Sequence, residues 1–446
     1  KSLRDKNRVR ILRVERGWHF SCASRRHTEH TTHFSQLAIL AAPSPQTITR
    51  DGMTRIGFAY NQKPETTAGR LPSGARSELG PEEEPPSKSS DVYAEWDSAE
   101  TIDAVASALS ALGDVIRIEA TEELPARLRS ERPDIVFNIA EGLNGTNREA
   151  HVPAICEFFG IPYSGSDPYT LSLCLHKART KDMLSAHGIA NAPYVVIEDE
   201  VSLENALRRT RGAGRTRSAR TDRRLTRPGR SLSALEFPLF LKPVHEGSSK
   251  GITERNFVRD RDELDAQARF LLGTYEQAVI AETFLPGAEF TCGVLGNGAN
   301  ARVLPIVGFN FESLPEGALP IYGYEAKWVW DTPDEPLAIF DCPARIDHRL
   351  KAAIEDVVLR AYRVLGCRDW SRIDVRLDAE GMPNVVEVNP LPGILPNPED
   401  NSCLPTAARA AGLSYDELIQ SALIAAAERT GVPVELPADG YRLPAA

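Results

Sequence analysis

The chain has 446 residues, of which 42% are hydrophobic and 26% charged, and its formal net charge at pH 7 is −10. This is the composition of a soluble globular protein with room for two or three lobes, and the negative charge argues against a general nucleic-acid binder. The longest apolar runs are too short for a membrane span and the seven cysteines lack C-x-x-C spacing, so we expect a cytoplasmic protein with reduced cysteines.

Residues 1–52 differ from the rest of the chain. They hold ten Lys and Arg against four Asp and Glu, and no methionine occurs before Met53. Because the segment lacks the apolar stretch of a secretory signal, we expect either a basic targeting arm or, in preference, sequence upstream of the biological start. His27, His30 and His33 are potential metal ligands, but a disordered tail is the simpler interpretation.

From Met53 onward, strand-like and helix-like segments alternate, which predicts an α/β architecture. The stretch 62–90 is rich in Pro, Ser, Gly and Glu and is predicted to be a flexible insertion. The other predicted elements of this first part are a strand at 55–60, a helix at 98–112, a strand at 134–139 and a helical segment at 153–159. Together they predict a small doubly wound domain, 53–170, with any ligand at the carboxyl ends of its strands.

A second lobe is predicted at 171–288. Its expected elements are a helix at 177–187, a strand at 194–197, a strand in FPLFLKP, a helix at 260–271 and a strand at 279–282. The block Arg208–Arg230 interrupts it with ten arginines and one acid, and we expect a disordered loop there. Contact of this block with RNA or another anion is the alternative.

The third lobe, 289–446, is predicted to contain strands near 289–295 and 301–306, a long helix at 347–365, a hairpin and two closing helices. The hairpin is RIDVRLDAEGMPNVVEVNPLPG, beginning at Arg372, which alternates apolar and polar residues around a glycine-bearing turn.

Hairpin pairing brings four polar residues together. With a loop of two residues, 380–381, or one residue more on each side, Asp374 lies opposite Glu387 and Arg372 lies opposite Asn389. Two opposed carboxylates repel each other by about 3 kcal/mol at an effective dielectric constant of 20, which favours a cation between them. Oxygen ligands of this kind suit Mg²⁺.

The alternative for the hairpin is a solvated polar face on which Arg372 and Arg376 neutralise the acids. The hairpin by itself does not decide between the two interpretations, so other segments of the chain have to.

Two further segments carry candidate binding residues. Lys242 ends a strand and precedes a loop with glycines and serines, which suits the approach of a phosphate, although the spacing is not that of a P-loop. Glu282 ends an apolar strand, and Glu289 follows seven residues later, an arrangement that can hold a ribose and an adenine edge. The alternatives are an ordinary turn and an edge strand that ends in a solvated acid.

Five segments, in this order, closely resemble the ATP-grasp superfamily and, within it, the D-alanine–D-alanine ligases: FPLFLKPVHEGSSKG, VIAETFLPGAEFT, YGYEAKWVW, LGCRDWSRIDVRLD and VVEVNPLPG. The similarity spans roughly residues 91–432. It implies an ATP-grasp fold of three lobes with a doubly wound pre-ATP-grasp domain at the N-terminal end. It also implies a reaction in which ATP phosphorylates one carboxylate and a second amino acid attacks the acyl phosphate, for peptidoglycan precursor synthesis.

The resemblance implies a role for each matching residue. Two Mg²⁺ ions, or Mn²⁺ in their place, are assigned to Asp374, Glu387 and Asn389, and the oxyanion to Arg372 and the backbone amide of Gly393. The phosphates of ATP are assigned to Lys177, Lys242, Lys327, Ser248 and Ser249. The adenosine pocket is assigned to Glu282, Phe284, Leu285 and Glu289.

The sequence departs from the family mainly near the amino-acid substrates. Glu95 is the best candidate to grip the first ammonium, and AEGLNGTNRE, with Glu141 and Arg148, replaces a histidine-glycine stretch. Ser402 matches the serine that contacts the second carboxylate if a gap of about four residues is allowed. Lys250 stands at a usually small, apolar position. These departures leave the ATP-binding residues in place and bear on the identity of the substrates.

We therefore expect a ligase of D-alanine to D-alanine whose partners are amino acids and ATP, with neither a membrane nor a nucleic acid involved. The close alternative is ligation of another amino acid, hydroxy acid or peptide. A hypothesis of another class is a non-catalytic nucleotide- or RNA-binding homologue. A homodimer is expected only from the resemblance.

Overall fold

The structure is a computed structural model that describes residues 53–64, 93, 95–211, 235–247, 249–323, 326, 330 and 337–435. The chain divides into two units, Lys1–Asp51 and Gly52–Ala446, and every described residue belongs to the second. The predictions made for the following residues lie outside the described part: 1–52, 65–90, 212–230, Ser248 and Lys327.

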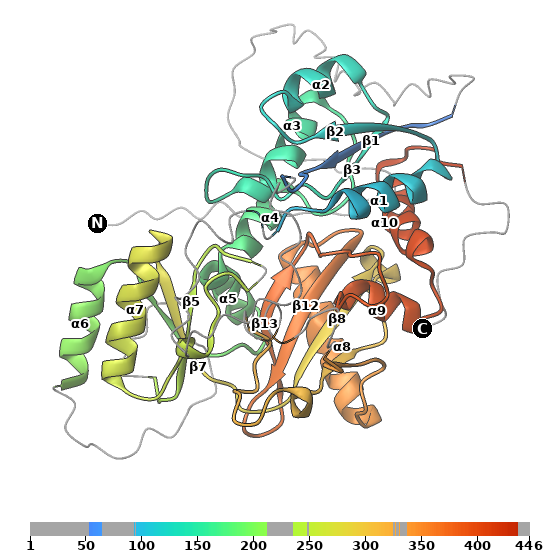
Figure 1. Ribbon diagram of the computed structural model, residues 1–446. Helices are drawn as coiled ribbons and strands as arrows, with labels where there is room; N and C mark the ends of the chain where they lie inside the picture. The colour runs from blue at the N-terminus through green and yellow to red at the C-terminus, as the bar shows by residue number, and fades with distance from the viewer. Residues whose placement is uncertain are drawn as a thin grey trace, which may run out of the picture. The chain divides into compact units, whose positions relative to one another are not determined.

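The first sheet has parallel strands in the order β2-β1-β3. Its elements are β1 (Arg55–Tyr60), β2 (Asp114–Glu119), β3 (Ile135–Asn138), α1 (Ala99–Ser110), α2 (Leu124–Glu131), η1 (Arg148–Ala150), α3 (His151–Phe159) and α4 (Pro168–Leu175). Figure 1 shows α2 and α3 on one side of this sheet and α1, with the later helix α10 (Tyr415–Thr430), on the other. Strands covered on both faces read as continuous apolar runs, as β3 does. The predicted doubly wound arrangement is confirmed for these elements.

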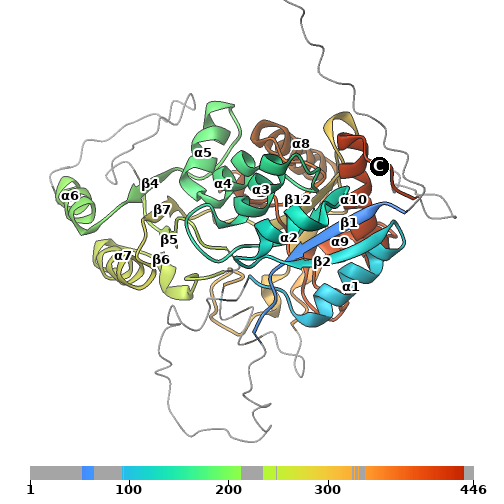
Figure 2. The ribbon, with the colours of Figure 1, turned by 90° about the horizontal axis from the view of Figure 1, so that it is seen from above.

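The second sheet is antiparallel, in the order β4-β7-β5-β6. Its elements are α5 (Lys177–Ala186), β4 (Tyr194–Ile197), α6 (Glu200–Arg211), β5 (Leu239–Pro243), η3 (Glu254–Asn256), β6 (Phe257–Val258), α7 (Arg261–Tyr275) and β7 (Val279–Thr283). Leu264, Ala268 and Leu271 recur at helical spacing on α7 and pack against the sheet, beside α6 (Figures 1 and 2). Because α6 continues to Arg211, the first four residues of the arginine block are helical and not loop, which corrects that prediction.

The third sheet runs β11-β10-β8-β12-β13, with β9 paired to β8. Its elements are β8 (Glu289–Leu295), η4 (Gly298–Asn300), β9 (Arg302–Val303), β10 (Val307–Phe309), η5 (Phe311–Ser313), β11 (Phe340–Asp341), α8 (His348–Leu365), β12 (Trp370–Leu377), β13 (Pro383–Asn389) and α9 (Cys403–Ala410). Helix α8 covers one face, whereas α9 and α10 join the core that contains β1 and α1. Within the described ranges, no helix combines the length and apolar character that a membrane crossing needs.

In the hairpin of β12 and β13, the polar residues pair as predicted. Asp374 lies opposite Glu387, and Arg372 lies opposite Asn389. The predicted loop is wrong, because a bulge after Asp374 shifts the register and Leu377 pairs with Pro383, which leaves five residues in the turn. The bulge absorbs one residue of β13 and so changes the turn without disturbing the polar pairs.

Asp369 is a fully buried carboxylate that ties distant parts of the fold together. It accepts hydrogen bonds from the Gly165 amide at 2.8 Å, from Asn297 at 2.7 Å and from the Arg429 guanidinium at 2.7 and 3.0 Å. Arg429, near the end of α10, also donates to the Tyr163 carbonyl at 2.9 Å. This network therefore joins α10 to the end of the first sheet and to the start of β12.

Replacing Arg429 by Met is expected to destabilise the protein by about 3 to 5 kcal/mol, because the buried Asp369 loses its countercharge. Urea unfolding measures the change. The control is Arg345→Met, which removes a side chain 86% exposed and should alter the free energy of unfolding by less than about 0.5 kcal/mol. Equal effects of the two substitutions would contradict the role given to Asp369.

Candidate active site

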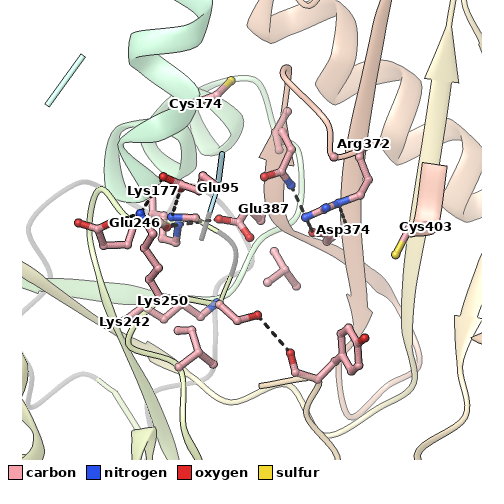
Figure 3. Close-up of a pocket in the computed structure, with 18 of the residues that line it drawn as sticks. Glu95, Cys174, Lys177, Lys242, Glu246, Lys250, Arg372, Asp374, Glu387 and Cys403 are labelled. Carbon is pink, nitrogen blue, oxygen red and sulfur yellow. Dashed lines mark hydrogen bonds and ion pairs between the residues drawn. The ribbon is translucent and has the colours of Figure 1, made fainter. Parts of the chain in front are cut away.

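A cavity of about 300 Å³ is lined by residues from all three sheets and their connections. Figure 3 shows Glu95, Lys177, Lys242 and Lys250 on one side and Arg372 and Asp374 of β12 on the other. The structure brings together every predicted site residue that it describes: Glu95, Lys177, Lys242, Ser249, Glu282, Phe284, Leu285, Glu289, Arg372, Asp374, Glu387, Asn389, Gly393 and Ser402. Residues assigned separately to nucleotide, metal and substrate thus share one cavity.

The polar pairs of the hairpin form one end of this cavity. Asp374 accepts hydrogen bonds from Arg372 at 3.0 and 3.2 Å, from Thr291 at 2.5 Å and from the Asn389 amide at 3.3 Å. These bonds hold the Asp374 carboxylate at a fixed place beside Asn389. Arg372 therefore neutralises Asp374, as the alternative of a solvated face proposed. Unlike in that alternative, both residues are half-buried and line a cavity.

Glu387 supplies the second carboxylate of this end. Its Oε1 lies 2.6 Å from Nζ of Lys177, which begins α5 and also donates to the Glu246 carbonyl. Burial raises the pKa of Glu387, but Lys177 and the hydrogen bond from it outweigh burial, so the pKa falls below its ordinary value. Two carboxylates and an amide on facing strands form an oxygen donor set, which fits Mg²⁺.

A buried charge cluster borders the cavity, which Lys242 and Glu282 line. Glu282 is the penultimate residue of β7 and lies 2.6 Å from Nζ of Lys242 and 2.8 Å from Nζ of Lys181. Burial alone would raise the pKa of Glu282, but the two ammonium groups lower it to about 2. The sequence interpretation missed Lys181, although it lies four residues after Lys177 on the same face of α5.

Acidification is expected to remove the stabilisation that Glu282 provides. The pKa of Glu282 falls from 4.5 to about 2 on folding, so this contribution is complete above pH 4.5 and is lost as the pH falls from 4.5 to 2. The shift corresponds to about 3 kcal/mol. Between neutral pH and pH 3, urea unfolding should therefore show a smaller loss of stability for Glu282→Gln than for the wild type. Parallel losses would contradict this assignment.

The residues assigned to adenosine are held by an arginine, Arg376, which the sequence analysis named only in the alternative of a solvated face. Arg376 is 5% exposed and donates to Glu289 at 2.6 Å and to the carbonyls of Leu285 at 2.7 Å and Pro320 at 2.8 Å. Its guanidinium lies 4.7 Å from the centre of the Phe284 ring. Arg376 thus fixes three of the residues assigned to the nucleotide.

Glu95 connects the loop after β5 to the part of the chain that contains the first sheet. Its carboxylate accepts hydrogen bonds from Arg148 at 2.9 Å to both oxygens, from Lys250 at 2.8 Å and from the Gly247 amide at 3.1 Å. A Cβ on Gly247 would lie 2.5 Å from a Glu95 oxygen, so a larger residue there would displace the Glu95 carboxylate. Burial raises the pKa of Glu95, but Arg148 and Lys250 bring it below its ordinary value.

Ser249 and Ser402 also line the cavity. Ser249 has φ +61°, in the left-handed region, and its hydroxyl donates to the Tyr322 carbonyl at 3.4 Å, which links the glycine-serine loop to the third sheet. Ser402 precedes α9 at the N-cap position and is 6% exposed, and its hydroxyl accepts a hydrogen bond from the Leu395 amide at 3.2 Å and not from the helix.

Comparison with known proteins agrees with this geometry. The family model described as "D-ala D-ala ligase C-terminus" matches residues 215–424. A D-alanine–D-alanine ligase of Bordetella petrii is 34% identical over 325 residues, which are 73% of this chain and 86% of that protein. The chain belongs to the D-alanine–D-alanine ligase family. A second ligase relative, from Stutzerimonas stutzeri, is 32% identical to this family member and covers 72% of it and 86% of its own length.

Solved structures of the D-alanine–D-alanine ligase family have the same fold. The ATP complex of the Bacillus anthracis D-alanine–D-alanine ligase has a TM-score of 0.55 at 20% identity and covers 85% of this chain and 99% of its own. The VanG D-Ala:D-Ser ligase of Enterococcus faecalis has a TM-score of 0.55 at 22% identity, with 84% and 99% covered. The predicted α/β ATP-grasp fold is confirmed.

Proposed function

We propose that the chain joins D-alanine to D-alanine through an acyl phosphate, as a step of peptidoglycan precursor synthesis. Membership of the family makes it an ATP-dependent ligase that forms C–N bonds. The observation that supports the proposal most strongly is the single cavity, because it collects every described residue that the resemblance assigned to the nucleotide, the metal or the substrates.

In the proposed reaction, a carboxylate oxygen of the first D-alanine attacks the γ-phosphorus of ATP, and ADP leaves. Lys177 and Lys242 place positive charge where phosphate oxygens accumulate negative charge, which is the main requirement of phosphoryl transfer. Asp374, Glu387 and Asn389 would hold Mg²⁺, or Mn²⁺, which neutralises phosphate charge when bound.

In the second step, the deprotonated amine of the second D-alanine attacks the acyl carbon. The carbonyl oxygen becomes an oxyanion, and phosphate leaves as the amide forms. Arg372 is half-buried and lines the cavity beside Asp374, where its guanidinium can stabilise this oxyanion together with the Gly393 amide. Ser402, which lines the same cavity, is assigned to the second carboxylate.

The test is an incubation with ATP, Mg²⁺ and D-alanine in which ADP release is measured and products are identified by mass. We expect ADP and D-alanyl-D-alanine in equal amounts, and no dipeptide from L-alanine. ATP turnover that yields only non-alanine products from a panel of amino and hydroxy acids would replace D-alanine with the alternative substrate class. Absence of turnover with every substrate would overturn the ligase assignment.

Three expectations from the sequence stay part of this proposal. They are the division into 53–170, 171–288 and 289–446, a homodimer, and a cytoplasmic location without nucleic-acid partners. Light scattering of the purified chain tests the second of these, and RNA binding before and after deletion of residues 212–230 tests the third.

A further inference from the structure

The second step of the proposed reaction needs a base. The amine of the second amino acid is mainly protonated at neutral pH, and only the neutral amine can attack the acyl carbon. Histidine is the usual proton acceptor near neutral pH, yet none of the described residues that line the cavity is a histidine. The base therefore has to be sought among the carboxylates of the cavity.

Most of these carboxylates are unsuitable because cations are bound to them. Burial alone would raise the pKa of Glu95, Glu282 and Glu387, but neighbouring cations bring it below its ordinary value. A carboxylate held in its charged form accepts a proton poorly. The described carboxylates of the cavity that lie 3.6 Å or less from a lysine or arginine nitrogen are Glu95, Glu246, Glu282, Glu289, Asp374 and Glu387.

Asp97 also lines the cavity, but its carboxylate has no such partner. Among the residues that the structure describes, none forms a hydrogen bond or an ion pair with this side chain. Its backbone is fixed, because the Asp97 amide donates to the Asn61 carbonyl at 3.0 Å and the Asp97 carbonyl accepts from the Lys63 amide at 2.8 Å. Asp97 is thus a firmly placed carboxylate whose oxygens are available to accept a proton.

The position of Asp97 in the fold brings it near the residues assigned to the second substrate. It immediately precedes the N-cap of α1, and α1 packs against α10 (Figure 1). Its charge acts on Tyr415, the first residue of α10, whose hydroxyl donates to the Ile394 carbonyl at 2.8 Å. Ile394 follows Gly393, and Ser402 accepts from the amide of the next residue at 3.2 Å. The segment assigned to the oxyanion and the second carboxylate therefore adjoins this contact.

Two other carboxylates of the cavity wall, Glu141 and Glu149, have different surroundings. The charges of Lys177 and Glu387, which are assigned to phosphate and metal, act on Glu149. The charges that act most strongly on Glu141 are those of Glu149 and Glu95. These two acids thus belong to the side of the cavity where the first carboxylate is phosphorylated.

We propose that Asp97 is the catalytic base that deprotonates the amine of the second amino acid. This inference rests on the proposed function, deepens it, and leaves the role assigned to Glu95 unchanged. One ammonium proton passes to the Asp97 carboxylate, the nitrogen lone pair forms the C–N bond, and the bond between the acyl carbon and the phosphate oxygen breaks. The second nitrogen proton leaves with the phosphate, and Asp97 returns its proton to water after product release.

The groups around Asp97 suit a base that works near neutral pH. Burial raises the pKa of Asp97 to about 7, and the Lys63 charge limits the increase. The titratable groups that face it from other elements are Glu141, in the connection after β3, and the Tyr415 hydroxyl on α10. Because the base has to be ionised, dipeptide formation should decline as the pH falls through 7.

The experiment compares two nucleophiles in the full-length enzyme and in Asp97→Asn. Hydroxylamine is mainly neutral at neutral pH, so it attacks the acyl phosphate without a base and gives a hydroxamate, whereas D-alanine needs the base. At neutral pH we expect Asp97→Asn to lower dipeptide formation about a hundredfold and to change hydroxamate formation less than about twofold. The deficit in dipeptide should shrink as the pH is raised, because more of the D-alanine is then neutral.

Two further variants sharpen the result. Asp97→Glu retains a carboxylate and should keep part of the dipeptide activity, together with its decline at acidic pH. The matched control is Asp103→Asn, which makes the same chemical change at an exposed position on α1 and should behave as the wild type.

The inference is overturned if Asp97→Asn forms the dipeptide at the wild-type rate. It is also overturned if dipeptide and hydroxamate fall equally in this variant, because Asp97 would then act only on the structure of the site. If the wild type forms neither product from ATP and D-alanine, the proposed function itself fails, which is a separate result.

Discussion

Glu387→Gln is expected to lower the turnover of ATP by a factor on the order of 10²–10³. The substitution removes one of the two charges of the metal-binding set and leaves Nζ of Lys177, now 2.6 Å from Glu387, without its carboxylate. The concentration of Mg²⁺ required for half-maximal activity should rise as well, which distinguishes loss of a metal ligand from general damage. ADP release at increasing Mg²⁺ concentrations measures both effects.

The matched control for this variant is Glu380→Gln, which makes the same chemical change at an exposed position in the turn of the same hairpin. Its turnover and Mg²⁺ dependence should equal those of the wild type. Full activity of Glu387→Gln at ordinary Mg²⁺ concentrations would remove Glu387 from the ligand set.

Arg372→Lys is the second substitution with a large expected effect, about a hundredfold in kcat. The guanidinium holds Asp374 through Nε at 3.2 Å and Nη2 at 3.0 Å, and an ammonium cannot reproduce this planar fork. Because the charge is kept and the nucleotide pocket is untouched, the KM for ATP should change little. Steady-state kinetics separate the two parameters.

Arg363→Lys is the control for the arginine substitution, since Arg363 is exposed near the end of α8. It should behave as the wild type. If Arg372→Lys retains normal kcat, then positive charge alone suffices at this place, and the proposed interaction with the oxyanion is not needed.

The faces on which the polar side chains of the hairpin lie were predictable, because successive side chains of a strand point to opposite faces. Alternation fixes which side chains of each strand share a face, and together with an assumed loop it placed Asp374 opposite Glu387; the pair is observed although the loop is not the predicted one, because the bulge compensates for the longer turn. The length of the turn was not predictable, because the bulge after Asp374 inserts a residue where the apolar pattern of VVEV gives no sign of it.

Contacts between residues far apart in the chain were the least predictable part of the site. The network of Glu95 joins Arg148, 53 residues away, to Lys250, 155 residues away, and no local pattern relates them. Arg376 shares the alternation of Arg372, yet it is buried because Glu289 and two carbonyls come from another strand and from loops. Long side chains of this kind are placed by tertiary structure and not by periodicity.

The central claim is that the first carboxylate is activated as an acyl phosphate, and isotope transfer tests it most directly. D-alanine carrying ¹⁸O in both carboxylate oxygens is incubated with ATP and Mg²⁺, and the inorganic phosphate released is analysed by mass. We predict one ¹⁸O atom in each phosphate, because the carboxylate oxygen that attacks the phosphorus leaves with it when the amide forms. Dipeptide formation accompanied by unlabelled phosphate would contradict the account.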